Sequence, residues 1–321
     1  MLGTSQLSAI ILLSLIVTVQ SQSLVINEVM SVNVSTIADE DLDFSDWIEL
    51  YNPREVILDL TGCGLSDDAD DPYKWIFPPV SLAPSDFLLI FASDKDRREL
   101  LHWNTIIRQG DRWSYHRGDS EPLAGWRTID FDDSAWPTGA SGFGYGDGDD
   151  ATMVQNVLSI YARTSFYIEN PDQVSRLLLH VDYDDGFIAY INGFEIARAN
   201  LGIPGEFIAH DRPADANHEA LGIQGLPPER FEVHDLSMLR SGRNVLAMQV
   251  HNVDATSSDM TLIPYLTIGC AAGENSVPAM LNLPAVHLHT NFKLKGGGET
   301  VVLVDAHGAL IDSLRSPALP Q

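Results

Sequence analysis

Short apolar stretches recur along the whole chain, and almost none of them has the period of a helix. Each is rich in β-branched and aromatic residues and is bounded by Pro, Gly, Asp or Asn, which favour turns. The predicted strands before Trp103 are 24–29, 47–51, 56–60, 73–77 and 87–91. Those after it are 164–168, 176–181, 187–191, 195–199, 231–234, 244–251 and 262–268. The pattern predicts an all-β chain of two β-sandwiches.

The clearest local prediction is a hairpin. The runs 187–191 and 194–197 are separated by Asn192-Gly193. These two residue types readily adopt the positive φ angles of a type I′ turn. In the first part of the chain, alternation places Trp47, Leu50, Trp75 and Phe77 in a sandwich core.

The longest apolar run, Ala9–Val19, is too short to cross a bilayer but suits the core of a secretory signal. Val19-Gln20-Ser21 follows, with small residues where a signal peptidase cleaves, although no Lys or Arg precedes the run. We therefore expect residues 1–21 to be a signal peptide and the mature chain to be secreted or at the cell surface, without a membrane span. The alternative is an uncleaved anchor.

Charge narrows the range of partners. The chain has 45 Asp and Glu against 19 Lys and Arg, a formal net charge of −26. Such a surface repels phosphate backbones and anionic lipids, which argues against nucleic-acid binding and against a membrane partner. It attracts cations, and calcium is the cation that carboxylates and carbonyls bind best.

Two turns combine Asp with Gly and are candidate calcium sites. One contains Asp147 and Asp149, and the other contains Asp184 and Asp185. Several oxygens can converge on one ion at such turns, although neither has the spacing of an EF-hand loop. The alternative is that these are solvated turns, so calcium is a candidate cofactor and no other is expected. Cys63 and Cys270 are the only cysteines, and they either form a disulfide or are two buried thiols.

The first part of the chain resembles the lamin tail domain of secreted bacterial proteins. The motifs that match in order are Ile26–Met30, Ile37–Asp41, Asp46–Pro53, Leu65–Asp68, Lys74–Pro78 and Phe91–Arg97. The resemblance implies an immunoglobulin-like β-sandwich used in binding or adhesion, with no catalytic residues.

The middle of the chain resembles a galactose-binding-like jelly roll. The matching segments are Trp126-Arg127, Phe131–Trp136, Gly142–Asp149, Asp184–Gly186, Tyr190–Gly193, Glu195–Arg198 and Asn244–Ala247. Such modules accompany lamin tail domains in large bacterial proteins, often together with a spore-coat-protein-H-like kinase domain. No segment of this chain resembles that kinase domain.

The end of the chain resembles the later strands of the lamin tail domain, in the segments Leu288–Leu294, Gly297–Asp305 and Ile311–Ser313. Residues 284–321 are too few to hold a core alone, so we expect them to complete the first sandwich. The expected organisation is a lamin tail domain of 22–102 and 284–321, interrupted by a jelly roll of 103–272 and a linker of 273–283. The rival is a second, truncated copy.

The favoured function is non-catalytic binding of extracellular or cell-surface carbohydrate or protein. Loops rich in Asp, Gly and aromatic residues suit sugars, whose ring faces stack on aromatics while their hydroxyls bond to carboxylates and amides. The candidate ligand-binding aromatics are Trp113, Tyr115, Phe143 and Tyr145. The alternative is an accessory region of a larger secreted enzyme, kinase-like or hydrolytic, whose catalytic domain lies outside this chain.

Overall fold

The computed structural model describes residues 24–146, 148–271, 275–284 and 286–317. It divides into two compact units, the first formed by residues 1–98 and 287–321 and the second by 99–286. Both are built from β-strands, with two 3₁₀ turns, Pro171–Gln173 and Gly222–Gln224, in the second unit. The expected signal peptide falls outside the described residues. In the part of the chain that is described, no helix has the length and apolar character needed to cross a membrane.

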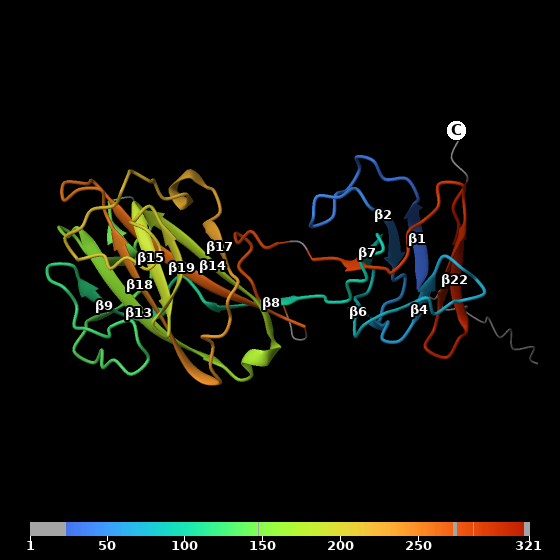
Figure 1. Ribbon diagram of the computed structural model, residues 1–321, viewed down its shortest axis with the longest axis horizontal. Coiled ribbons are helices and arrows are strands. Elements are labelled where there is room, and N and C mark those ends of the chain that lie inside the picture. The colour runs from blue at the N-terminus through green and yellow to red at the C-terminus, as the bar shows by residue number, and fades with distance from the viewer. Residues whose placement is uncertain (1–23, 147, 272–274, 285, 318–321) are drawn as a thin grey trace, which may run out of the picture. The chain divides into compact units, whose positions relative to one another are not determined.

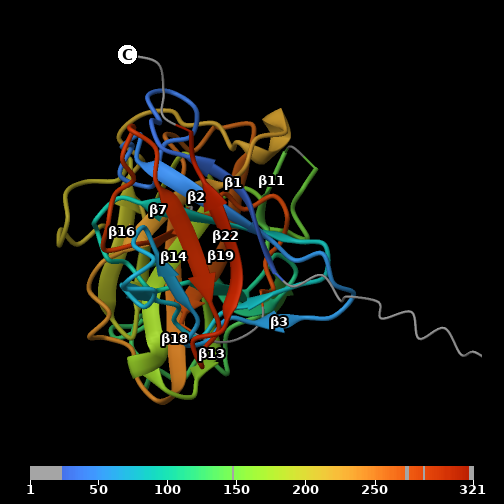
Figure 2. The ribbon, with the colours of Figure 1, turned by 90° about the vertical axis from the view of Figure 1, so that its right-hand side faces the viewer.

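Unit 1 is a sandwich of two four-stranded sheets with a two-stranded sheet beside them (Figure 1, Figure 2). The first sheet has the order β1 (Val25–Met30), β2 (Asp46–Tyr51), β7 (Phe87–Ala92) and β20 (Leu288–His289). The second has the order β22 (Leu310–Arg315), β21 (Thr300–Val304), β4 (Gly64–Ser66) and β5 (Trp75–Ile76). The small sheet pairs β3 (Leu58–Asp59) with β6 (Ser81–Leu82).

Both large sheets of unit 1 are completed by the end of the chain. β20 pairs in parallel with β7, where Leu288 lies opposite Ile90. β21 pairs antiparallel with β4, where Leu303 lies opposite Leu65. Residues 287–317 therefore belong to the same sandwich as residues 24–98, the arrangement that the split organisation predicts. The chain leaves this unit after Arg98 and returns at His287, a few residues from the expected boundaries.

The core of unit 1 contains the side chains that alternation assigned to it. Trp47, Leu50, Trp75 and Phe77 are all buried. Trp75 and Phe77 pack edge to face, with ring centroids 4.8 Å apart. Period-two alternation was therefore a sound guide in this sandwich, because one face of each strand meets the other sheet.

Unit 2 is a larger sandwich of two six-stranded sheets. Sheet F has the order β10 (Thr138–Ala140), β9 (Arg112–Arg117), β13 (Ser159–Ile168), β18 (Gly242–His251), β15 (Gly186–Ile191) and β16 (Phe194–Ala199). Sheet E has the order β12 (Thr152–Met153), β11 (Phe143–Tyr145), β19 (Met260–Cys270), β14 (Val174–Asp184) and β17 (Glu229–Val233). β8 (His102–Ile107) also pairs with β19.

Alternation along β14 divides its side chains between the core and the outer face of sheet E. Leu177, Leu179, Val181 and Tyr183 belong to the main core. His180, Asp182 and Asp184 alternate with them and so point to the opposite face. These three are nevertheless buried, because loops cover that face. The outer face of sheet E is therefore a second, polar layer.

The predicted hairpin is confirmed. Ile191 pairs with Phe194 across a two-residue turn. Asn192 has φ 53° and Gly193 has φ 94°, the positive values that a type I′ turn requires. The Asn192 side chain also holds the turn, because its amide donates to the carbonyl of Met238 at 2.9 Å.

The segment expected as a linker, 273–283, is instead part of unit 2 in its described residues. Ser276 and Thr105 are joined by a backbone hydrogen bond of 2.9 Å. Leu281 is buried in a small cluster with Ile263 and Tyr265 of β19. Val277 also packs against this cluster, so the apolar side chains of the segment cover part of the outer face of sheet E.

Candidate functional site

The four aromatic residues predicted to bind ligand do not form an exposed platform. Trp113 and Phe143 are buried in the main core of unit 2, so they are unavailable for stacking on a ligand and the prediction is wrong for both. Tyr115 packs against the same core, its ring centroid 5.4 Å from that of Phe143. The Gly-rich and Asp-rich surroundings suggested exposed loops, whereas β9 and β11 carry these rings inward.

Tyr145 lies at the end of β11 and is only partly buried. Its hydroxyl donates to the carbonyl of Ser257 at 3.1 Å and accepts from the Asn252 amide at 3.1 Å. Burial raises the pKa of this hydroxyl, and the nearby carboxylates of Asp259 and Asp184 raise it further. Tyr145 is thus anchored beside acidic groups at one end of sheet E.

The two cysteines do not form a disulfide. Cys63 and Cys270 are both free thiols, Cys63 being buried in unit 1 and Cys270 half-buried in unit 2. Burial raises the pKa of both thiols, which disfavours the reactive thiolate. The alternative of two separate thiols was the correct one.

The structure places the candidate calcium ligands in different environments. Asp147 lies outside the described residues. Asp149 lines a small cavity on the outer face of sheet E. Asp184 and Asp185 are both buried at the end of β14. Of the predicted set, Asp184 is the one that joins a group of converging carboxylates.

That group consists of Asp184, Glu219 and Asp259. Each offers one carboxylate oxygen, and the three oxygens lie within 4.8 Å of one another. Asp184 is buried, Asp259 is half-buried and Glu219 is exposed, so the group extends from the interior to solvent. Glu219 and Asp259 were not predicted, because they come from loops far from Asp184 in sequence.

The surroundings of Asp184 disfavour its charged form. Burial, and then the charges of Asp185, Asp259 and Glu219, raise its pKa to about 8. A carboxyl whose pKa is raised this far keeps its proton at neutral pH unless a cation compensates its charge. The group is therefore poised either to hold a proton or to bind a positive ion.

The two neighbouring buried aspartates have a different role. The carboxylate of Asp185 accepts from the backbone of His218 at 2.6 Å and of Val253 at 2.7 Å. That of Asp182 accepts from Leu221 at 2.6 Å and Gly222 at 2.9 Å. Both carboxylates fasten loops to the sheet, which satisfies their charge with backbone donors.

These anchors also position the acidic group. His218 is held by Asp185, and its ring stacks on Tyr183 with centroids 4.1 Å apart, which fixes the adjacent Glu219. Asp259 is held through its carbonyl by the Asn252 amide at 2.9 Å. Gly146 lies so close to Asp259 that a Cβ at residue 146 would be 2.6 Å from the Asp259 Cβ. Only glycine fits there, and its φ of 114° also favours glycine.

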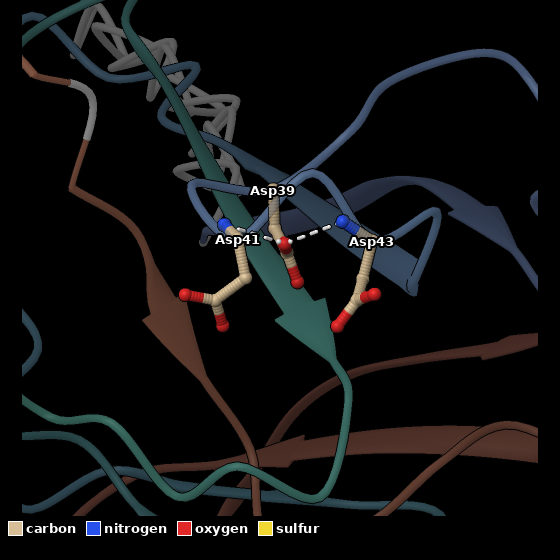
Figure 3. A group of neighbouring side chains, drawn as sticks. All are labelled: Asp39, Asp41 and Asp43. Carbon is tan, nitrogen blue, oxygen red and sulfur yellow. Dashed lines mark hydrogen bonds between the residues drawn. The ribbon is translucent and has the colours of Figure 1, made fainter.

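Unit 1 contains a second triplet, Asp39, Asp41 and Asp43, whose oxygens also lie within 4.8 Å of one another. The alternating spacing in one loop makes the three side chains converge (Figure 3). The Asp39 carboxylate accepts from the backbone N–H groups of Asp41 and Asp43, each at 3.0 Å. Lys95 places its ammonium 2.6 Å from Asp39, 2.6 Å from Asp41 and 3.0 Å from Asp43.

The lysine changes the electrostatics of this triplet. Burial alone would raise the pKa of Asp39, but Lys95 and the two backbone donors bring it below its ordinary value. Arg97 and then Lys95 lower the pKa of Asp41 to about 2. The Lys95 ammonium thus compensates all three carboxylates. It occupies the position among them that a metal ion would take.

Beside this triplet, one histidine joins the two segments of unit 1. His289 is buried, with Nε2 3.0 Å from Glu40 Oε1 and Nδ1 2.7 Å from Ser93 Oγ. Arg97 also donates to Glu40 at 3.0 Å. This network holds β20 against β7, so we assign it to the architecture of the split sandwich.

The outer face of sheet E carries a cavity of about 150 Å³. Asp149, Asp182 and Gln109 provide polar groups in its wall, and Tyr265 and Met280 are among the residues that provide apolar surface. Register places the cavity near the acidic group, because Asp182 pairs with Ile263 and Asp184 pairs with Thr261 on the same strands. Acceptors and apolar surface therefore meet on one side of unit 2.

Comparison with known proteins gives only distant likenesses. No family model matches this chain, and no curated protein sequence matches it. A β-glucuronidase 2 structure from Bacteroides uniformis is similar, with 13% identity and a TM-score of 0.35, over 68% of this chain and 26% of that one. A β-glycosidase from Bacteroides vulgatus has 10% identity and a TM-score of 0.33, over 67% and 33% of the two chains.

A glycosyl hydrolase family 2 member from Bacteroides cellulosilyticus has 13% identity and a TM-score of 0.33, over 67% of this chain and 29% of the other. The chain thus matches a third or less of the length of each of these structures. At such scores the likeness carries nothing about function, and the site must be judged by its own chemistry.

Proposed function

We propose that this chain is an extracellular, non-catalytic binding protein that recognises a carbohydrate on the outer face of sheet E. One observation carries the proposal: a buried and a half-buried carboxylate, an amide and a tyrosine line a cavity on that face. Sugar hydroxyls donate to carboxylates and amides, while the C–H faces of a sugar pack on apolar and aromatic surface.

The size of the cavity limits what it accepts. Its volume of about 150 Å³ is below the roughly 300–1,000 Å³ of pockets that enclose drug-sized ligands. Asp149, Gln109 and Met280 lie in its wall, so both polar and apolar contacts are available. We expect it to take one sugar residue, or the end of a chain, and to leave the remainder in solvent.

The roles of the neighbouring aspartates support binding without turnover. Catalysis by carboxylates needs an acid and a base that are free to exchange protons with the substrate. Asp182 and Asp185 each accept two backbone hydrogen bonds and fasten loops. A rigid arrangement of acceptors suits recognition, because little order is lost when the ligand binds.

The wider setting is part of the same proposal. The motifs in 24–98 and 284–321 that resemble a lamin tail domain favour an adhesive role, and the middle segment resembles a galactose-binding-like jelly roll. The apolar run at Ala9–Val19 favours export. An extracellular protein partner is the competing ligand class.

The test is a glycan array screened with the full chain, followed by titration of the best glycan. We expect Asp149→Asn, in the cavity wall, to weaken binding roughly tenfold, because one hydrogen bond to a charged acceptor is replaced. Asp130→Asn is the matched control, because this exposed aspartate lies in the loop over the other sheet. Absence of binding to every glycan, or equal loss in both variants, would contradict the proposal.

A further inference from the structure

The carboxylates of the acidic group of unit 2 lie close enough to share one calcium ion. Calcium binds six to eight oxygens at about 2.4 Å, so two oxygens on opposite sides of the ion are about 4.8 Å apart. The oxygens of Asp184, Glu219 and Asp259 all lie within 4.8 Å of one another, no farther apart than one ion can bridge. Calcium accepts a flexible set of carboxylate and amide oxygens, whereas magnesium requires a near-ideal octahedron and usually keeps several waters.

A second observation is independent of the carboxylates. Asn252 is completely buried, and its Oδ1 has no hydrogen-bond donor among the described residues. Its carboxamide lies beside the acidic group, because Nδ2 donates to the Asp259 carbonyl at 2.9 Å and to the Tyr145 hydroxyl at 3.1 Å. Exchanging oxygen and nitrogen would set two oxygens against each other at Asp259, so the orientation is determined by the contacts.

A buried amide oxygen without a donor destabilises the folded protein. Asparagine side-chain oxygens are common calcium ligands, and a bound cation would remove that destabilisation. In addition, no Lys or Arg forms an ion pair with Asp184, Glu219 or Asp259 in the described part of the chain. Lys95 does so for the triplet of unit 1. The unit 2 group therefore offers oxygen ligands without a side-chain cation.

We propose that Asp184, Glu219 and Asp259, with the side-chain oxygen of Asn252, form a binding site for one calcium ion. The ion would compensate the charges that meet at Asp184, and solvent would supply the remaining ligands on the side of the exposed Glu219. Asp185 is not part of the converging group, and each of its two oxygens accepts a backbone hydrogen bond. The site goes beyond the proposed function, because calcium can bind whether or not a sugar does.

Calorimetry measures calcium binding directly. Titration of the full chain with calcium chloride should show one site, and titration with magnesium chloride should show weaker binding.

Two variants and one matched control test the ligand assignment with the full chain. Asp259→Asn and Glu219→Gln should each weaken calcium binding roughly tenfold or more. Asp43→Asn changes the net charge equally but lies beside Lys95, so calcium affinity should be unchanged. Glu219 is exposed, so its variant keeps the test valid if Asp259→Asn does not fold.

No binding at millimolar calcium, or binding that neither unit 2 variant weakens, would overturn the proposal. Equal affinity for magnesium would overturn the assignment to calcium. Because these titrations contain no glycan, calcium binding without any glycan ligand would refute only the proposed function. Glycan binding without calcium binding would refute only the metal site.

Discussion

The two units each bring three carboxylates within 4.8 Å of one another but treat their charge differently. In unit 1 the three aspartates come from one loop and surround the Lys95 ammonium. In unit 2 the three acidic residues come from a strand end and two loops, and the charges that act on Asp184 are those of other acids, Asp185, Asp259 and Glu219. Proximity of carboxylates therefore does not by itself define a metal site. Whether a positively charged side chain already compensates the carboxylates also matters.

The pKa values record this difference. Asp39 and Asp41 have lowered pKa values because cationic and backbone donors favour their charged forms. Asp184 has a raised pKa because burial and negative neighbours disfavour its charged form. The charges of the unit 1 triplet are thus compensated within the protein. The unit 2 group would be stabilised by a ligand that brings positive charge.

The largest expected effect comes from removing the internal cation. Lys95→Met should destabilise unit 1 by about 2–3 kcal/mol at neutral pH, because it leaves the buried Asp39 carboxylate unpaired, and 20% exposure of Lys95 places the loss at the low end. Urea unfolding measures it. Lys295→Met is the control. That side chain is 77% exposed and its ammonium lies 3.7 Å from Glu299, so this ion pair contributes little to stability.

The same variant sharpens the comparison when calcium is added. Without Lys95, the three aspartates resemble the acidic group of unit 2, so millimolar calcium should restore part of the lost stability. A loss no larger than that of Lys295→Met would show that the lysine is not a structural cation.

The next effect is a contrast in pH dependence. The stabilisation from Asp39, whose folded pKa lies below its ordinary 3.8, is present above that value and is lost as pH falls through the folded pKa. For Asp184 without calcium the sign is opposite. Its folded pKa of about 8 means that stability falls as pH rises from about 4 to 8, by up to about 1.4 kcal/mol per pH unit.

Asp184→Asn should remove this second slope, and saturating calcium should also remove it in the unchanged protein. Thermal unfolding from pH 4 to 8, with and without a chelator, provides the measurement. A calcium-free protein whose stability is constant over that range would show that Asp184 is not strained.

The smallest effect separates the scaffold of the unit 2 group from its ligands. Tyr145→Phe removes the hydroxyl that bonds to Ser257 and Asn252, and should reduce stability by about 1 kcal/mol. Calcium affinity should change less than threefold, because Tyr145 supports Asn252 and is not itself a proposed ligand. A loss of affinity as large as that of Asp259→Asn would make the hydroxyl part of the site.

Local patterns predicted most of the fold. Alternation placed Trp47, Leu50, Trp75 and Phe77 in the core, and Asn192-Gly193 identified a hairpin, because period and turn geometry depend on adjacent residues. The motifs near both ends of the chain predicted one sandwich made from two distant segments. Trp113 and Phe143 were misplaced because Gly-rich surroundings are typical of exposed loops as well as of short strands.

The sequence by itself determined the all-β architecture and the acidic character, since both follow from local composition and period. It also singled out Asp184. Only the tertiary structure decided which carboxylates converge, that Glu219 and Asp259 join Asp184, and that Lys95 lies among Asp39, Asp41 and Asp43. The reason is physical: the charge state of a carboxylate depends on its burial and on neighbours a few ångströms away, and chain folding draws those neighbours from positions that no local pattern connects.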